Sequence, residues 1–480
     1  MSEQLSSRQK RFAWIRSAIE RRSASAFGMM LVVLMGLIGI VQGLPNGFIV
    51  VIVTAVIVHE FQKRLDQGVP LLQLTSLIAV LQWLVGPLLS YSSRNAFERY
   101  TMYVPEEQYF RFAIPATTFY VTVMLLAGAS VRQQNLLQQI DRRKFFTIGV
   151  LLNIVAIFAA IAATRVSGSL AFLMHLISQL RYVGAIYFLL SRSQVRLVFA
   201  ALSCIQLFSS SLGVGMFHDL ILWLAILFCY WFAQRKRTTL FKIVVLTATT
   251  VSLFSIQVVK QEYREQIRRG GQPSLIGLVF AYVTPGGRAW DTDVLSLAVT
   301  RLNQGWIISA VMHHVPENEP FAGGETIRAA VLGSLLPRFL SSDKATAGGR
   351  ESFRRFTGLL ILDSTSMSIS PLGEAYANFG KLFGTISMVV FGTCFALFYR
   401  LTLRYCLKYP TFLFWIPLIF YQAIKAETEF LVIMNQLVKG AVVAFGCHFV
   451  VERVFPTRIR HVSPAIAALP LPMNRPETIA

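Results

Sequence analysis

Charged residues are scarce in this sequence. Of its 480 residues, only 14% are Asp, Glu, Lys or Arg, whereas 54% are hydrophobic. A soluble domain usually has about 25% charged residues. The low charge content and a mean hydropathy of +0.56 argue against an ordinary soluble enzyme. They predict a chain that is surrounded mainly by lipid.

Cysteine is also scarce, and its distribution argues against disulfide, zinc and redox sites. Four of the five cysteines fall in apolar runs and one in a basic loop, without a CxxC pair: Cys204, Cys229, Cys394, Cys406 and Cys447. No disulfide framework, metal site or redox centre is therefore expected. No Walker-type loop, GxSxG or HExxH motif stands out either, so the sequence gives no signal for a cofactor.

Long apolar runs, in contrast, are abundant. Runs that approach the ~20 helical residues needed to cross a bilayer recur at 27–43, 47–60, 70–91, 111–129, 146–164, 170–190, 197–213, 215–233, 240–259, 380–399, 411–426 and 429–450. Lipid offers no hydrogen bonds to free backbone groups, and the alternation typical of a barrel is missing, so the runs must be helices. The sequence predicts an all-α polytopic membrane protein with about 12 transmembrane helices.

Basic residues set the orientation of these spans. The first 26 residues are basic and lead into an apolar run without a small-residue cleavage site, which predicts an uncleaved first span. If both termini are cytoplasmic, the short loops rich in Lys and Arg all lie inside, as the positive-inside rule requires. Most of the net charge of +21 is then a signal of topology, and we do not interpret it as nucleic-acid binding.

This topology divides the chain into five parts. A basic N-terminus at 1–26 precedes nine spans at 27–259, a single outer loop at 260–379, three further spans at 380–450 and a cytoplasmic tail at 451–480. Structureless loops of this length are usually functional or disordered. This loop is rich in aromatic and apolar residues, which argues against disorder. We therefore expect it to contain short helices and the functional site.

Arginine dominates the cations of the outer loop. A guanidinium binds phosphate oxygens in a bidentate manner, whereas Lys acts as a point charge. Five cations fall within 338–355, beside a membrane where a lipid-linked diphosphate would lie. These five cations and one arginine further upstream are the candidate phosphate ligands: Arg301, Arg338, Lys344, Arg350, Arg354 and Arg355. The alternative is a solvated surface whose charges are balanced by nearby Asp and Glu.

The most distinctive local pattern is Pro-Leu-Gly-Glu-Ala-Tyr-Ala-Asn-Phe-Gly at 371–380, where the outer loop enters the next span. If this stretch is helical, Glu374 and Asn378 lie one turn apart on the same face, with Tyr376 between them. A carboxylate at a membrane interface can serve as a general base. The alternative is a helix start, in which Ser368 or Ser370 is the cap and Glu374 complements the helix dipole.

Other ionisable residues are weaker candidates. His313, His314 and Asp363 could act as bases, although adjacent histidines point to different helix faces and do not form a natural metal pair. His218 and Asp219 lie in an outer turn that enters a span and are either functional groups or interfacial anchors. Arg181 lies inside a span, where it either pairs with a carboxylate or extends toward the cytoplasmic surface.

Four segments together resemble the outer loop of bacterial oligosaccharide repeat-unit polymerases, the Wzy-type polymerases of O-antigen and exopolysaccharide assembly. They are Arg301-Leu-Asn-Gln-Gly-Trp-Ile, Pro320-Phe-Ala-Gly-Gly, Leu336-Pro-Arg with Lys344, and the stretch at 371–380. The Gly-Glu-x-Tyr-x-Asn-Phe-Gly part is the most specific. The resemblance covers the plan of the helical bundle and especially residues 301–392.

The resemblance implies a GT-C-like fold and an inverting, metal-independent glycosyltransferase without a cofactor. Such an enzyme joins undecaprenyl-diphosphate-linked oligosaccharides at the periplasmic face of the bacterial inner membrane, in a pathway with a flippase and a chain-length regulator. Arg338, Arg301 and Arg354 are then expected at the diphosphate, and the other loop cations nearby. Glu374 is expected as the base or as the group that orients the acceptor. Tyr376 and Asn378 are expected to support it.

Three other functions fit the same features. An O-antigen ligase has a similar bundle and outer loop but transfers glycan to lipid A core. A transporter or flippase also commonly has a dozen spans, although no equal halves or inverted repeats are detectable. A non-enzymatic subunit of a polysaccharide export complex is the third alternative.

Overall fold

The computed structural model describes a chain of helices. The described residues are 19–20, 25–65, 67–92, 100–131, 140–214, 218–234, 237–245, 302–335, 349–361 and 367–457, with single positions at 263, 266, 269, 271, 274 and 277. Within them the only strands are the two-residue antiparallel pair β1 (Ile19–Glu20) and β2 (Ser130–Val131). The prediction of an all-α chain is confirmed for this part of the chain.

Seven helical runs among the described residues are long and apolar enough to cross a membrane. They are α3 (Asn46–Arg64), the continuous run of α4 (Leu71–Val80), η1 (Leu81–Val85) and α5 (Gly86–Ser92), α6 (Glu106–Ala127), α8 (Phe145–Ala163), α9 (Gly168–Ser178) with α10 (Leu180–Leu190), α20 (Ser370–Lys408) and α22 (Phe430–Val454). The chain is therefore a multi-pass membrane protein, as the apolar runs predict.

Shorter helices complete the described fold. Three apolar ones are α2 (Ala26–Val41), α13 (His218–Phe232) and the run of η5 (Pro410–Trp415) with α21 (Ile416–Ile424). The others are α11 (Arg196–Ser203), α12 (Ile205–Val214), α17 (Gly305–His314), α18 (Glu325–Leu335) and α19 (Arg350–Thr357). Residues 246–259, most of the predicted ninth span, lie outside the described residues.

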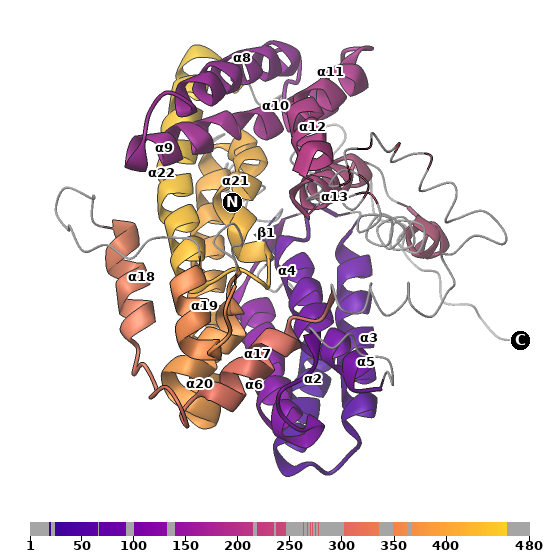
Figure 1. The fold of residues 1–480 in the computed structure, drawn as a ribbon. Helices are drawn as coiled ribbons and strands as arrows, with labels where there is room; N and C mark the ends of the chain where they lie inside the picture. The colour runs from indigo at the N-terminus through magenta and orange to yellow at the C-terminus, as the bar shows by residue number, and fades with distance from the viewer. Residues whose placement is uncertain are drawn as a thin grey trace, which may run out of the picture.

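The bundle has two recognisable ends. In Figure 1, α2, α3, α4, α6, α20 and α22 form an upright bundle, and α8 and α10 lie across its upper end. α17 and α19 lie against its lower half, and α18 stands at the left beside α22. Apolar side chains on the outside are left uncovered; Phe158 of α8, for example, is 68% exposed. Exposed apolar side chains are expected where lipid replaces water around the helices.

Glycines allow a close contact between α8 and α10. A Cβ atom on Gly149 of α8 would lie 2.7 Å from the ring of Phe188, and one on Gly184 of α10 would lie 2.4 Å from Asn153 Nδ2. Small residues allow such close backbone approach between membrane helices. The α8–α10 pair depends on them.

The helix that follows the outer loop begins earlier than predicted. Hydropathy placed this span at 380–399, whereas α20 begins at Ser370 and includes the whole motif at 371–380. The motif contains polar residues, so it does not register as an apolar run. Its first turns form a short helix that joins the long one at a break, and this break organises the candidate site.

Candidate functional site

α20 is broken at Gly380, whose backbone has φ 68° and ψ −158°. This region of backbone space is essentially restricted to glycine. The ring of Phe321 covers the break, because a Cβ atom on Gly380 would lie 3.0 Å from it. The last residue of the motif is thus required by the local geometry.

A loop docks on the helix end that the break creates. The backbone N–H of Ala322 donates to the carbonyl of Ala377, and that of Gly323 donates to the carbonyl of Asn378, both at 3.0 Å. A helix end leaves such carbonyl groups without intrahelical partners. The segment Pro-Phe-Ala-Gly-Gly at 320–324 satisfies them, so two of the segments that carry the resemblance lie against each other.

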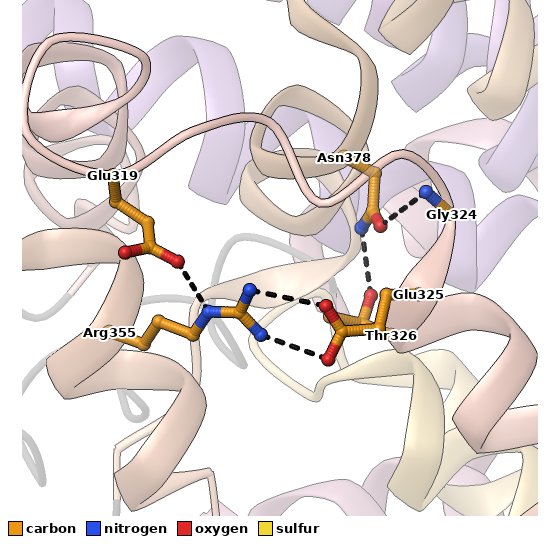
Figure 2. Close-up of polar contacts among 6 residues, drawn as sticks. All are labelled: Glu319, Gly324, Glu325, Thr326, Arg355 and Asn378. Atoms are coloured by element: carbon orange, nitrogen blue, oxygen red, sulfur yellow. Dashed lines mark hydrogen bonds and ion pairs between the residues drawn. The ribbon is translucent and has the colours of Figure 1, made fainter.

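Asn378 fixes this loop from the helix side (Figure 2). Its side-chain oxygen accepts the N–H of Gly324 at 3.0 Å, and its Nδ2 donates to Thr326 Oγ1 at 2.7 Å. The same Nδ2 donates to the carbonyl of Glu374 at 2.8 Å. Asn378 is buried, and these bonds use its oxygen and both N–H groups. In this geometry it holds the loop in place.

Glu374 joins the motif to the start of α22. Its Oε2 accepts the backbone N–H of Phe430, the first residue of α22, at 2.8 Å. It also accepts a hydrogen bond from the hydroxyl of Thr326. A carboxylate is favoured at a helix N-terminus because the first N–H groups have no partner inside the helix. The residue is only 5% exposed, so its carboxylate has little contact with solvent or lipid.

The start of α20 also matches the helix-start interpretation in one respect. The hydroxyl of Ser370 accepts the N–H of Gly373 at 3.3 Å. The first turn of α20 holds no acidic residue, so the prediction that Glu374 complements the dipole of its own helix is wrong; its carboxylate accepts from the N-terminus of α22 instead. Tyr376 is buried between two rings, with centroids 5.1 Å from Phe112 and 6.2 Å from Phe321.

Arg355 is held by two carboxylates (Figure 2). Its Nε lies 2.6 Å from Glu319 Oε1, and its two terminal nitrogens each lie 3.1 Å from an oxygen of Glu325. Hydrogen bonding to Arg355 lowers the pKa of Glu325, and the bonds to Glu325 and then Glu319 raise the pKa of the guanidinium. Arg355 therefore clamps α18 to α19, and a phosphate would have to displace a bidentate carboxylate.

The other two cations of α19 lie on its outward side. The helix is amphipathic: Phe353 and Phe356 are buried, while Arg350 and Arg354 lie one turn apart on the more exposed side. Arg354 Nη2 donates to the carbonyl of Ile361 at 2.9 Å. The remaining predicted phosphate ligands, Arg301, Arg338 and Lys344, lie outside the described residues.

The segment 425–430, which joins α21 to α22, is a hub that sequence reasoning missed. Lys425 Nζ lies 2.7 Å from Asp219 Oδ1 at the start of α13, and the ammonium lies 4.6 Å from the centre of the Tyr421 ring. Glu427 Oε2 accepts from Gln304 Nε2 at 3.4 Å, just before α17. With Phe430 bound to Glu374, this 425–430 loop connects α13, α17 and α20.

A π-helical turn in the third span connects a fourth element to the hub. In η1, the carbonyl of Gln82 accepts the N–H of Gln304 at 3.1 Å, and Trp83 Nε1 donates to the carbonyl of Ala426 at 3.1 Å. π-turns disturb the regular helical bonding and frequently mark functional sites. This one lets the start of α17 and the 425–430 loop meet the same span.

Glu427 is the most accessible of the three glutamates in or beside the 425–430 loop. Glu374 and Glu429 are buried, whereas Glu427 is half-buried. The signal in the sequence is the run Lys-Ala-Glu-Thr-Glu at 425–429, which places three ionisable groups between two apolar runs. Ionisable groups at membrane depth are functional candidates by default. The loop is short, however, and loop length was the criterion that singled out the outer loop at 260–379.

Among the residues that the structure describes, no three His, Cys, Asp or Glu side chains gather as a set of metal ligands. No family of known proteins, no curated protein and no solved structure matches this chain.

Proposed function

We propose that this protein polymerises undecaprenyl-diphosphate-linked oligosaccharide repeat units into O-antigen or exopolysaccharide at the periplasmic face of a bacterial inner membrane. It would act as an inverting, metal-independent glycosyltransferase. The observation that carries the proposal is the docking of the 320–324 segment on the motif at 371–380. These segments, far apart in the sequence, are two of the four that resemble the polymerases, and they form one structural unit beside the 425–430 loop.

The contacts between helix ends support the finer topology, with about 12 spans, cytoplasmic termini and one large periplasmic loop. At the ends assigned to the outside, Asn46 bonds to Glu106 at 3.1 Å and Lys425 to Asp219 at 2.7 Å. At the ends assigned to the inside, Tyr230 bonds to the carbonyl of Leu413 at 2.7 Å. Each of these pairs joins two ends that the alternation of spans places on the same side.

The reaction needs a base and a cationic site for the leaving group. A hydroxyl oxygen of the incoming unit attacks the anomeric carbon of the growing chain, and the bond from that carbon to the lipid diphosphate breaks. The base takes the hydroxyl proton, and the anomeric configuration inverts. Charge develops on the leaving diphosphate, so preplaced guanidinium groups stabilise the transition state. Arg338, Arg301 and Arg354 are proposed for that role.

Two carboxylates compete for the role of base. The sequence pattern favours Glu374, but its oxygens are engaged by Phe430 and Thr326 in a buried setting. Glu427 is half-buried and lies on the adjacent loop. We propose Glu427 as the base that meets the sugar hydroxyl, with Glu374 as the group that holds the 425–430 loop and α22 in position. Tyr376 and Asn378 support the same assembly.

Deletion of the gene tests the proposed function. The lipid-linked glycans of the deletion strain are expected to collapse from a ladder to a single repeat unit that accumulates on the periplasmic side. Long polymer that is merely unattached to lipid A core would indicate a ligase instead. Single units that accumulate on the cytoplasmic side would indicate a flippase. An unchanged ladder would contradict all three functions.

A further inference from the structure

A cavity of about 190 Å³ lies at the other end of α22 from the 425–430 loop. It is lined by the segment that leads into α8 and the first turn of α8, by α10, by the start of η5 and by the end of α22 with the residues that follow it. Its polar lining consists of Asp141, Arg143, Lys144, Tyr187, Thr411, Glu452 and Thr457. The volume far exceeds the ~15 Å³ that a single water needs, so a small polar group fits. None of these residues takes part in the proposed reaction.

The floor of the cavity is a carboxylate held by hydroxyl groups. Glu452 Oε1 accepts the backbone N–H of Thr457 at 2.7 Å, and its Oε2 accepts the Thr457 hydroxyl at 2.7 Å. The buried hydroxyl of Thr411 lies 3.3 Å from the same Oε2. These bonds fix the carboxylate in one orientation, with Tyr187 beside it. A fixed, largely buried negative charge favours a cationic group in the cavity.

The rim of the cavity carries the opposite charge. Arg143 and Lys144 are exposed, and the Lys144 ammonium lies 5.7 Å from the centre of the Phe455 ring, which also lines the cavity. Asp141 is the remaining carboxylate, and its Oδ1 lies 4.0 Å from Arg143 Nε. An anion alone would meet Glu452, and a cation alone would have to pass the two rim cations. A group with both charges fits both regions.

The end of α22 assigned to the cytoplasmic side also carries uncovered apolar side chains. Phe449, Val450 and Val454 are each more than half exposed, and the helical period places them on the face opposite the lining residues Val451 and Glu452. Exposed apolar side chains on a membrane helix face lipid chains. The cavity therefore lies at the end of a helix that contacts lipid, at the level where phospholipid head groups would lie.

We propose that this cavity binds the head group of a phospholipid that carries both a phosphate and a primary ammonium, as phosphatidylethanolamine does. The ammonium donates to Glu452, with the hydroxyls of Thr411 and Tyr187 as further acceptors. The phosphate lies between Lys144 and Arg143 at the rim. Basic pockets between membrane helices are known to bind lipid head groups; the carboxylate on the floor adds selectivity for the ammonium. This site is independent of the proposed polymerase reaction.

Native mass spectrometry of the full-length purified protein tests the site. The protein is titrated in detergent with phosphatidylethanolamine, phosphatidylcholine or phosphatidylglycerol of matched chains. We expect one phosphatidylethanolamine to be retained at least tenfold more strongly than either other lipid. Phosphatidylcholine has no N–H to donate, and phosphatidylglycerol has no cation. Lys144→Ala at the exposed rim should weaken this retention tenfold, and Glu452→Gln should remove the preference over phosphatidylglycerol.

The control is Arg404→Ala, which removes an exposed cation of α20 that does not line the cavity. It should bind phosphatidylethanolamine as the wild type does. Equal retention of the three lipids, a preference for phosphatidylglycerol, or unchanged binding by Lys144→Ala would overturn the proposal. Lys144 is exposed, so that variant gives a decisive result even if Glu452→Gln fails to fold.

Discussion

Replacing Glu427 by glutamine is expected to abolish polymer while the protein remains folded in the membrane. Glutamine keeps the size of the side chain and an oxygen that can accept from Gln304, whose Nε2 lies 3.4 Å from Glu427 Oε2, but it cannot take a proton from a sugar hydroxyl. General base catalysis contributes about 10²- to 10⁴-fold, so the expected loss is at least 100-fold. The measurement is the polymer ladder of a deletion strain that carries the variant, with the membrane level of the protein assayed in parallel.

Two further carboxylates sharpen this test. Glu107→Gln changes an exposed residue at the first turn of α6 and should leave the ladder unchanged. Glu374→Gln removes the negative charge at the start of α22 and should lower the melting temperature as well as the amount of polymer. A normal ladder from Glu427→Gln, together with loss of polymer by a fully stable Glu374→Gln, would assign the base to Glu374 instead.

Replacing Gly380 by alanine is expected to destabilise the protein strongly. The backbone there has φ 68° and ψ −158°, and non-glycine residues in such regions cost about 1–3 kcal/mol. The new methyl group would also lie 3.0 Å from the Phe321 ring, so the ring and the docked loop must move. We expect a clear fall in the melting temperature of the purified protein and weakened polymer formation, because the site loses its docked segment.

Gly446→Ala is the matched control for this prediction. Gly446 lies inside α22, and a Cβ atom placed on it meets nothing within 4 Å. Alanine is favoured over glycine inside a helix by roughly 0.5–1 kcal/mol, so the melting temperature should stay the same or rise slightly. If both variants melt at the same temperature, the helix break does not have the structural importance assigned to it.

The apolar spans could be predicted closely from the sequence. The span expected at 146–164 is α8, Phe145–Ala163, and the one expected at 429–450 is α22, Phe430–Val454. Length and hydropathy determine these helices because lipid imposes a fixed thickness and forbids free backbone groups. The prediction that Glu374 and Asn378 lie one helical turn apart is also confirmed, since Asn378 Nδ2 donates to the carbonyl of Glu374.

The partners of the functional side chains could not be predicted. Glu374 meets Phe430, and Lys425 meets Asp219, across long stretches of sequence. No local pattern encodes such pairs. Arg355 shows the same limit: its position beside a membrane suggests a phosphate ligand, whereas Glu319 and Glu325 hold it in an ion-pair clamp. The π-turn at Leu81–Val85 likewise lies in an apolar run that hydropathy treats as uniform.

The most direct test of the proposed activity is a reconstituted reaction. The purified protein is placed in liposomes with a single lipid-linked repeat unit from its own organism, and the glycan products are separated by length. We predict a ladder of two or more units and the release of undecaprenyl diphosphate, both lost in Glu427→Gln. If the wild-type protein leaves the single unit unchanged although its melting curve shows that it is folded, the proposed polymerase activity is contradicted.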